Sequence, residues 1–91
     1  MSNPVVDNPS KGRFEMGTPA GLAVAHYRLD GNVMTIYHTE VPVALRGRGV
    51  GGQLVEGVLS ELRRLNLKVV PSCGFVRAFM QRNTQFQDLL A

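Results

Sequence analysis

The sequence has no tryptophan, a single cysteine and no long apolar run. One thiol cannot close a disulfide within its own chain, so we expect Cys73 to stay reduced, as in a cytoplasmic protein. Residues 1–4 also lack the basic and apolar segments of a secretion signal. No run approaches the roughly 20 apolar residues that cross a bilayer, so no membrane role is predicted.

Charge is sparse as well. The chain has 91 residues and a formal net charge of +3, and its eight arginines are dispersed apart from two close pairs, Arg46 with Arg48 and Arg63 with Arg64. A nucleic-acid-binding surface usually concentrates basic residues on one face and interleaves them with aromatic residues. That pattern is missing, so we expect no nucleic-acid partner, and salt-dependent binding to a phosphate backbone would test this weaker alternative. Two neighbouring arginines could equally bind a small anionic ligand at one point of the surface.

The N-terminal part of the sequence predicts an arm followed by strands. Residues 1–12 contain two prolines and little apolar periodicity, which predicts a mobile arm before a single domain of residues 13–91. Residues 21–29 and 32–41 each alternate apolar and polar side chains, as strands do. The dipeptide Asp30-Gly31 between them predicts a β-hairpin because both residues tolerate positive φ. Pro42 has no amide for a neighbouring strand, so the second hairpin strand must bend, bulge or stop there.

The apolar period becomes helical from Val50 onward. Gly57 inside this helix costs about 1 kcal/mol relative to alanine, which close packing against the sheet would offset. Asn66 is placed to end the helix in a left-handed conformation. A short strand then precedes Pro71, and residues 75–81 predict a last helix. The fold class is therefore mixed α/β, with a bent, mostly antiparallel sheet, one parallel strand-helix-strand unit and two helices.

A glycine-rich stretch, Arg46-Gly47-Arg48-Gly49-Val50-Gly51-Gly52, lies between a strand end and a helix start. Unpaired amides and the helix dipole favour an anion there, and the two arginines would neutralise a diphosphate. The triphosphatase loop is excluded because its lysine and hydroxyl are absent. The spacing Gly47-x-Gly49-x-x-Gly52 matches the dinucleotide fingerprint in letters, but no acidic residue follows for a ribose and the upstream hairpin contradicts a doubly wound sheet.

A third type of phosphate-binding loop matches the sequence at each of its defined positions. Arg46-x-x-Gly49-x-Gly51 resembles the Arg/Gln-x-x-Gly-x-Gly/Ala loop of the GNAT superfamily. With Glu40-Val41-Pro42 before the loop and the segment Val70-Pro71-Ser72-Cys73-Gly74-Phe75-Val76 after it, the chain resembles the small Yjdj-type acetyltransferases over roughly residues 13–91. One departure is Gly74, where that pattern commonly has proline.

The resemblance implies an enzyme that moves an acetyl group from acetyl-CoA, its co-substrate, directly to an amine carried by a small molecule or a protein. It implies no metal, and we expect a monomer or weak dimer. The loop amides and the strand edge before the loop would bind coenzyme A, which assigns this role to Val41, Arg46, Gly47, Arg48, Gly49, Val50, Gly51 and Gly52. The rival function is a coenzyme A-binding module without turnover, which shares every loop feature.

Three residues are candidates for catalysis. Cys73 could protonate the departing thiolate, carry an acetyl group as a nucleophile, or serve only as a small buried hydrophobe. Many enzymes of the GNAT superfamily, which the chain resembles, use a tyrosine on the final helix as this acid, and residues 75–83 contain none. His38 and Glu40 share a strand face by their two-residue spacing and could deprotonate an ammonium acceptor, or they could be structural polar groups.

Overall fold

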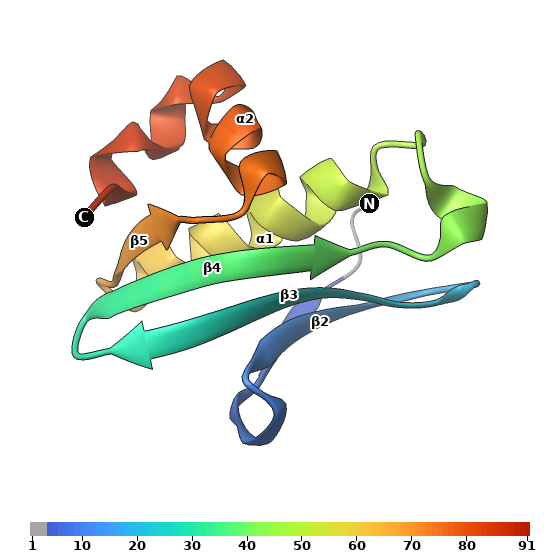
Figure 1. Ribbon diagram of the computed structural model, residues 1–91, viewed down its shortest axis with the longest axis horizontal. Coiled ribbons are helices and arrows are strands. Elements are labelled where there is room, and N and C mark those ends of the chain that lie inside the picture. Colours follow the sequence, from blue (N-terminus) through green and yellow to red (C-terminus); the bar gives the residue numbers. More distant parts are fainter. Residues whose placement is uncertain (1–3) are drawn as a thin grey trace.

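The computed structural model describes residues 4–91 as a five-stranded sheet with its helices on one face (Figure 1). The strands lie in sequence order; the first four are antiparallel, and the last pairs with the fourth in parallel. This confirms the predicted fold class. The strands are β1 (Val5–Asn8), β2 (Arg13–Thr18), β3 (Gly21–Asp30), β4 (Val33–Glu40) and β5 (Lys68–Pro71). The helices are α1 (Val50–Arg64) and α2 (Gly74–Arg82), with 3-10 turns at Pro9–Lys11, Val43–Leu45 and Thr84–Leu89.

The structure corrects the predicted arm from residue 5 onward, because β1 is the outer strand of the sheet and pairs with β2. The hydroxyl of Tyr27 donates a 2.6 Å hydrogen bond to Asp7 of β1. That contact joins residues 20 positions apart, which local periodicity cannot reveal. The remainder of the predicted arm, residues 1–3, lies outside the described residues.

Gly57 is explained by the same strand. A Cβ placed on Gly57 would collide with the side chain of Val5, so the glycine leaves a notch on α1 that the β1 valine fills. The packing that offsets the helix cost is therefore with β1, the strand that the sequence did not predict. At the other end of α1, Asn66 has φ 58°, as its predicted left-handed role requires.

The predicted hairpin joins β3 and β4, but its turn is shifted by one residue. Asp30 pairs with Val33, so the two connecting residues are Gly31 and Asn32, with Gly31 at φ 61°. Further along, His26 pairs with His38 while Tyr27 pairs with Ile36. Tyr37 is the extra residue of a β-bulge, which breaks the regular alternation of side chains along β4.

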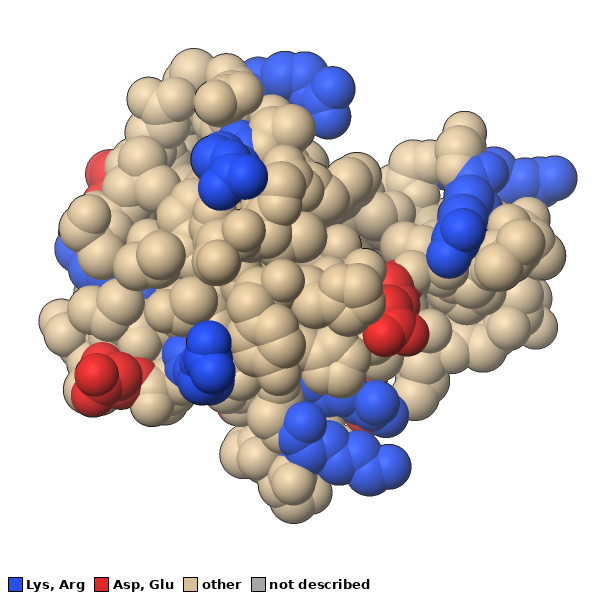
Figure 2. Space-filling view, in the orientation of Figure 1, with Lys and Arg blue, Asp and Glu red and all other residues tan. Residues whose placement is uncertain are grey.

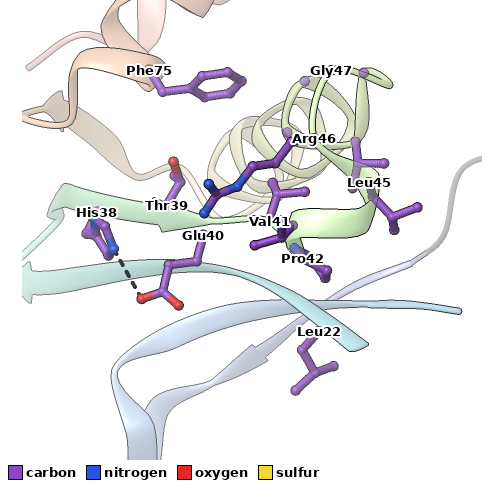
Figure 3. A pocket seen from close by; sticks show the side chains of 15 residues that line it. Leu22, His38, Thr39, Glu40, Val41, Pro42, Leu45, Arg46, Gly47 and Phe75 are labelled. Carbon is purple, nitrogen blue, oxygen red and sulfur yellow. Dashed lines mark hydrogen bonds and ion pairs between the residues drawn. The ribbon is translucent and has the colours of Figure 1, made fainter. Parts of the chain in front are cut away.

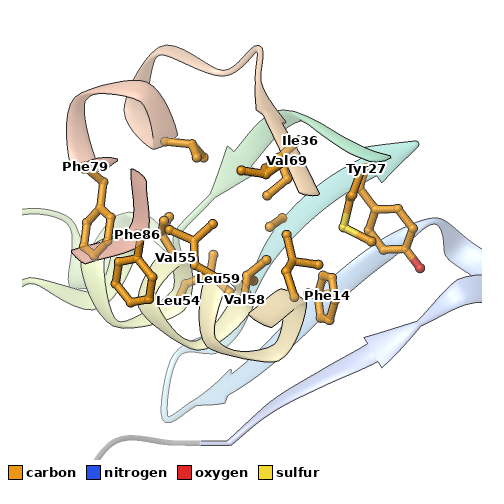
Figure 4. Packing of buried hydrophobic residues seen from close by; sticks show 14 of the residues in the cluster. Phe14, Tyr27, Ile36, Leu54, Val55, Val58, Leu59, Val69, Phe79 and Phe86 are labelled. Atoms are coloured by element: carbon orange, nitrogen blue, oxygen red, sulfur yellow. The ribbon is translucent and has the colours of Figure 1, made fainter. Parts of the chain in front are cut away.

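The core lies between the sheet and α1 (Figure 4). The helical period from Val50 predicts one apolar stripe, and α1 buries its middle part, whereas Val50 at the start is half-buried and Leu65, just after the helix, is exposed. Complete burial of each aliphatic side chain contributes about 1.5–3 kcal/mol, which outweighs the weak intrinsic helix preference of a segment with three glycines. The buried helix residues are Leu54, Val55, Val58, Leu59 and Leu62.

Candidate acetyl-transfer site

The sheet opens where β5 ends. The β4–β5 ladder stops at the pair Ile36–Pro71, and the amide of Cys73 then donates a 3.0 Å hydrogen bond to the carbonyl of Ile36. The chain turns away into α2, whereas β4 runs on to Glu40. Within residues 4–91, no strand pairs with this last part of β4 on the β5 side.

A cleft of about 870 Å³ occupies this opening. In the space-filling view, a hollow separates the body of the protein from the projecting loop after β4 (Figure 2). The lining comes from the end of β4, the loop, the start of α1, and single residues of β3 and α2. The lining residues are Leu22, His38, Thr39, Glu40, Val41, Pro42, Val43, Leu45, Arg46, Gly47, Gly49, Val50, Gly51, Gly52 and Phe75.

Two glycines give the loop its path. Gly47 and Gly49 have φ values of 79° and 77°, a region that residues with a Cβ enter only at a cost of about 1–2 kcal/mol. A Cβ at either position would meet no atom within 4 Å, so backbone conformation, and not space, requires glycine there. The left-handed Gly49 is the residue that caps α1 at its N-terminus.

The loop and the first turn of α1 present unpaired amides to the cleft. The amides of Gly47, Gly49, Val50, Gly51 and Gly52 donate no hydrogen bond to any described residue. Such donors, at the positive end of a helix dipole, form an anion-binding site. The amide of Arg48 is the exception, because it donates to the carbonyl of Leu45 at 3.3 Å.

The two loop arginines differ in position. Arg46 lines the cleft, and Figure 3 shows its side chain reaching from the loop back over Val41. Arg48 is not among the lining residues. Neither guanidinium forms an ion pair with a described residue, so the charge of Arg46 is available to an anion in the cleft.

Phe75 forms the wall opposite β4 and was not predicted as a site residue. Its ring, 42% exposed, lies directly over Gly51, where a Cβ would come within 2.7 Å of the ring. In Figure 3 the ring extends from α2 across the cleft toward the loop. Gly51 therefore allows α1 and α2 to begin close together, which narrows the cleft at the end where the unpaired amides lie.

Cys73 caps the N-terminus of α2 and lies next to the cleft without lining it. Burial raises the pKa of its thiol, but hydrogen bonds from the Val76 amide, the Thr39 hydroxyl and nearby amides outweigh that effect and lower the pKa overall. The Thr39 oxygen is 3.7 Å from the sulfur, and Thr39 itself lines the cleft. Thr39 is thus a residue that sequence reasoning missed between two predicted neighbours.

The structure brings His38 and Glu40 together at the other end of the cleft. The Nε2 atom of His38 is 3.1 Å from a carboxylate oxygen of Glu40, and both side chains are more than half exposed. Because the bulge at Tyr37 shifts the alternation, these two residues are exposed while Thr39, between them, is partly buried beside Cys73. The strand is regular from His38 to Glu40, so the prediction that these two residues share a face is confirmed.

Among the described residues, no three metal-ligating side chains lie close enough together to hold an ion. In the same part of the chain, no helix has the length and apolar character needed to span a bilayer.

The split between β4 and β5, together with the unpaired amides at the start of α1, defines the GNAT class of fold. The chain belongs to the GCN5-related N-acetyltransferase family, whose model matches residues 13–89. At the level of this family, the chain is grouped with acyltransferase enzymes.

One solved structure agrees with this placement, and one further protein is similar over part of its length. The solution structure of a GCN5-like protein from Staphylococcus aureus is 33% identical, with a TM-score of 0.73 over 100% of this chain and 91% of that one. Protein NATD1 of Bos taurus is 32% identical over 51 residues, which are 56% of this chain. That match spans 45% of the length of NATD1.

Proposed function

We propose that the protein transfers the acetyl group of acetyl-CoA to a primary amine. The observation that carries this proposal is the position of five unpaired amides at one end of a cleft that has a histidine–carboxylate pair at its other end. A thioester donor carrying a diphosphate needs the first feature, and an ammonium acceptor needs a proton acceptor such as the second.

On the donor side, the free amides from Gly47 to Gly52 would bind the diphosphate, with the guanidinium of Arg46 adding a charge-assisted contact. The pantetheine would then follow the open edge of β4 past Val41, opposite the ring of Phe75. Arg48, predicted for the same role, would contribute mainly to the general positive charge of the loop because it lies outside the cleft lining.

On the acceptor side, the His38–Glu40 pair would take a proton from the ammonium group. The freed amine nitrogen attacks the thioester carbonyl carbon, the C–N bond forms, and the C–S bond breaks. The nitrogen loses its second proton to the leaving thiolate, so the products are an acetylated amine, coenzyme A and the proton held by the His38–Glu40 pair. We infer direct attack, because Cys73 does not line the cleft, whereas its neighbours Thr39 and Phe75 do.

The acceptor side is open, since both α-helices lie on the other face of the sheet (Figure 1). An open surface suits an amine carried by a large molecule, such as a protein lysine or N-terminus, as well as a free polyamine. The substrate class we propose is therefore a primary amine on an extended or flexible carrier.

The proposal is tested by release of free thiol from acetyl-CoA with a panel of amines: lysine peptides, peptide N-termini and polyamines. We expect release with at least one amine, and no acetyl adduct on Cys73 in the intact mass after incubation without an acceptor. Tight coenzyme A binding without release for any amine would instead indicate a binding module, and an adduct on Cys73 would replace direct attack with a covalent route.

A further inference from the structure

His26, on β3, lies beside the cleft and contacts both members of the proposed proton-accepting pair. Its ring is stacked on that of His38, with centroids 5.8 Å apart and planes 21° from parallel. Its Nε2 atom is 3.8 Å from the same Glu40 oxygen that His38 contacts at 3.1 Å. On β4, the ring of Tyr37 lies 6.1 Å from that of His26, tilted by 33°.

The three side chains differ in how firmly their surroundings hold them. The His26 side chain is 23% exposed, whereas those of His38 and Glu40 are 55% and 59% exposed. An exposed side chain loses rotamer freedom when it is held in one geometry, and that entropy opposes the pairing of two such groups. The less exposed ring of His26 is therefore held more firmly, and the more exposed ring of His38 packs against it.

The pairing with Glu40 also determines which nitrogen of His38 can act as a base. An ionised carboxylate only accepts hydrogen bonds, so the 3.1 Å contact requires the proton of neutral His38 to be on Nε2. The lone pair is then on Nδ1, which is the atom able to take a proton from an acceptor amine.

We propose that His26 is a positioning residue that holds the imidazole of His38 against Glu40 in its Nε2-protonated form. It acts through ring stacking, not by touching the acetyl donor, because it is outside the cleft lining. The β-bulge makes this contact possible, since it pairs His26 directly with His38. This inference rests on the proposed function for the base role of His38, whereas the positioning itself can be observed without turnover.

The test compares the variants His26→Phe and His26→Ala with the wild type. The chain has only two histidines, so each variant leaves a single imidazole, and long-range nitrogen–proton spectra then report the tautomer of His38 directly. We expect the Nε2-protonated form in the wild type and in His26→Phe, which keeps a stacking ring, and a mixture of tautomers in His26→Ala. With an amine that is turned over, His26→Ala should lower kcat about tenfold at an unchanged KM for acetyl-CoA, and His26→Phe should restore most of that loss.

Two results would overturn the inference. One is a His38 tautomer in His26→Ala that is identical to that of the wild type. The other is an equal change in both variants, which would mean that the ring is not what positions His38. If the wild type turns over no amine, the proposed function fails, while the tautomer spectra still decide the role of His26.

Discussion

The two ends of the cleft are built differently. The end proposed to bind the donor, called the donor end below, consists of main-chain amides fixed by glycine conformation, within one continuous segment of the chain. The end proposed to bind the acceptor, the acceptor end, consists of exposed side chains whose arrangement depends on a bulge and on the pairing of β3 with β4. We therefore expect the donor end to tolerate side-chain substitutions, except those that change the backbone conformation or remove Arg46. At the acceptor end, we expect the exchange of a single side-chain atom to change activity.

The largest effect is expected at the acceptor end. Glu40→Gln keeps the shape of the side chain but removes the carboxylate that orients His38, so kcat should fall about 100-fold while coenzyme A affinity is unchanged. Steady-state kinetics with the best amine and calorimetry with coenzyme A measure the two quantities. Glu56→Gln, on the exposed side of α1, is the matched control. An unchanged kcat in Glu40→Gln would contradict the role of the Glu40 carboxylate in orienting His38.

The second effect separates the two loop arginines. Arg46→Ala should weaken coenzyme A binding about tenfold, which corresponds to the loss of one charge-assisted hydrogen bond, whereas Arg48→Ala should change it less than about threefold. Calorimetry on both variants provides the comparison, and each serves as a control for the other. Equal losses would mean that the loop acts only through its total charge.

A third, smaller effect concerns the backbone of the loop. Gly49→Ala should weaken coenzyme A binding about fivefold and lower the free energy of unfolding by about 1 kcal/mol, because alanine is strained at φ 77°. Gly31→Ala is the matched control, since Gly31 also has positive φ and open space around it but lies in the distant hairpin turn. It should lose similar stability and keep full affinity. If both variants bind equally well, loop conformation is not what holds the donor.

The smallest effect is expected at Cys73, which does not line the cleft but contacts Thr39, which does. The lowered pKa means that more of the thiol is ionised at any pH below its ordinary value, so its alkylation rate should rise at lower pH than that of a free cysteine. Thr39→Val removes the hydroxyl that helps to stabilise the thiolate, so the rise should move to higher pH. Iodoacetamide kinetics over about 4 pH units around the ordinary thiol pKa would measure this shift. Identical profiles would remove Thr39 from this role.

The same contrast explains what the sequence could predict. The donor loop is local, so the spacing of Gly47, Gly49 and Gly51 was enough to predict both its place between strand and helix and its free amides. The prediction for Arg48 needed its side-chain direction, which spacing does not contain, and the structure places that side chain outside the cleft lining. Coenzyme A binding by these residues stays a prediction.

Features that depend on contacts distant in sequence were missed. Strand β1 is held by the Tyr27–Asp7 hydrogen bond and by the packing of Val5 against Gly57, and neither contact leaves a periodic pattern in the sequence. His26 is paired with His38 only because the bulge sets that register. Two-residue spacing still identified His38 and Glu40 as neighbours, since a strand presents alternate residues on one face.

The most direct test of the account is a two-dimensional amide spectrum titrated with coenzyme A. The account predicts saturable shifts centred on the amides of Gly47, Gly49, Val50, Gly51 and Gly52, with little change in the remote hairpin turn at Gly31. If saturating coenzyme A leaves the amides of this loop unmoved, the anion-binding role of the loop, and with it the proposed acetyl transfer, is contradicted.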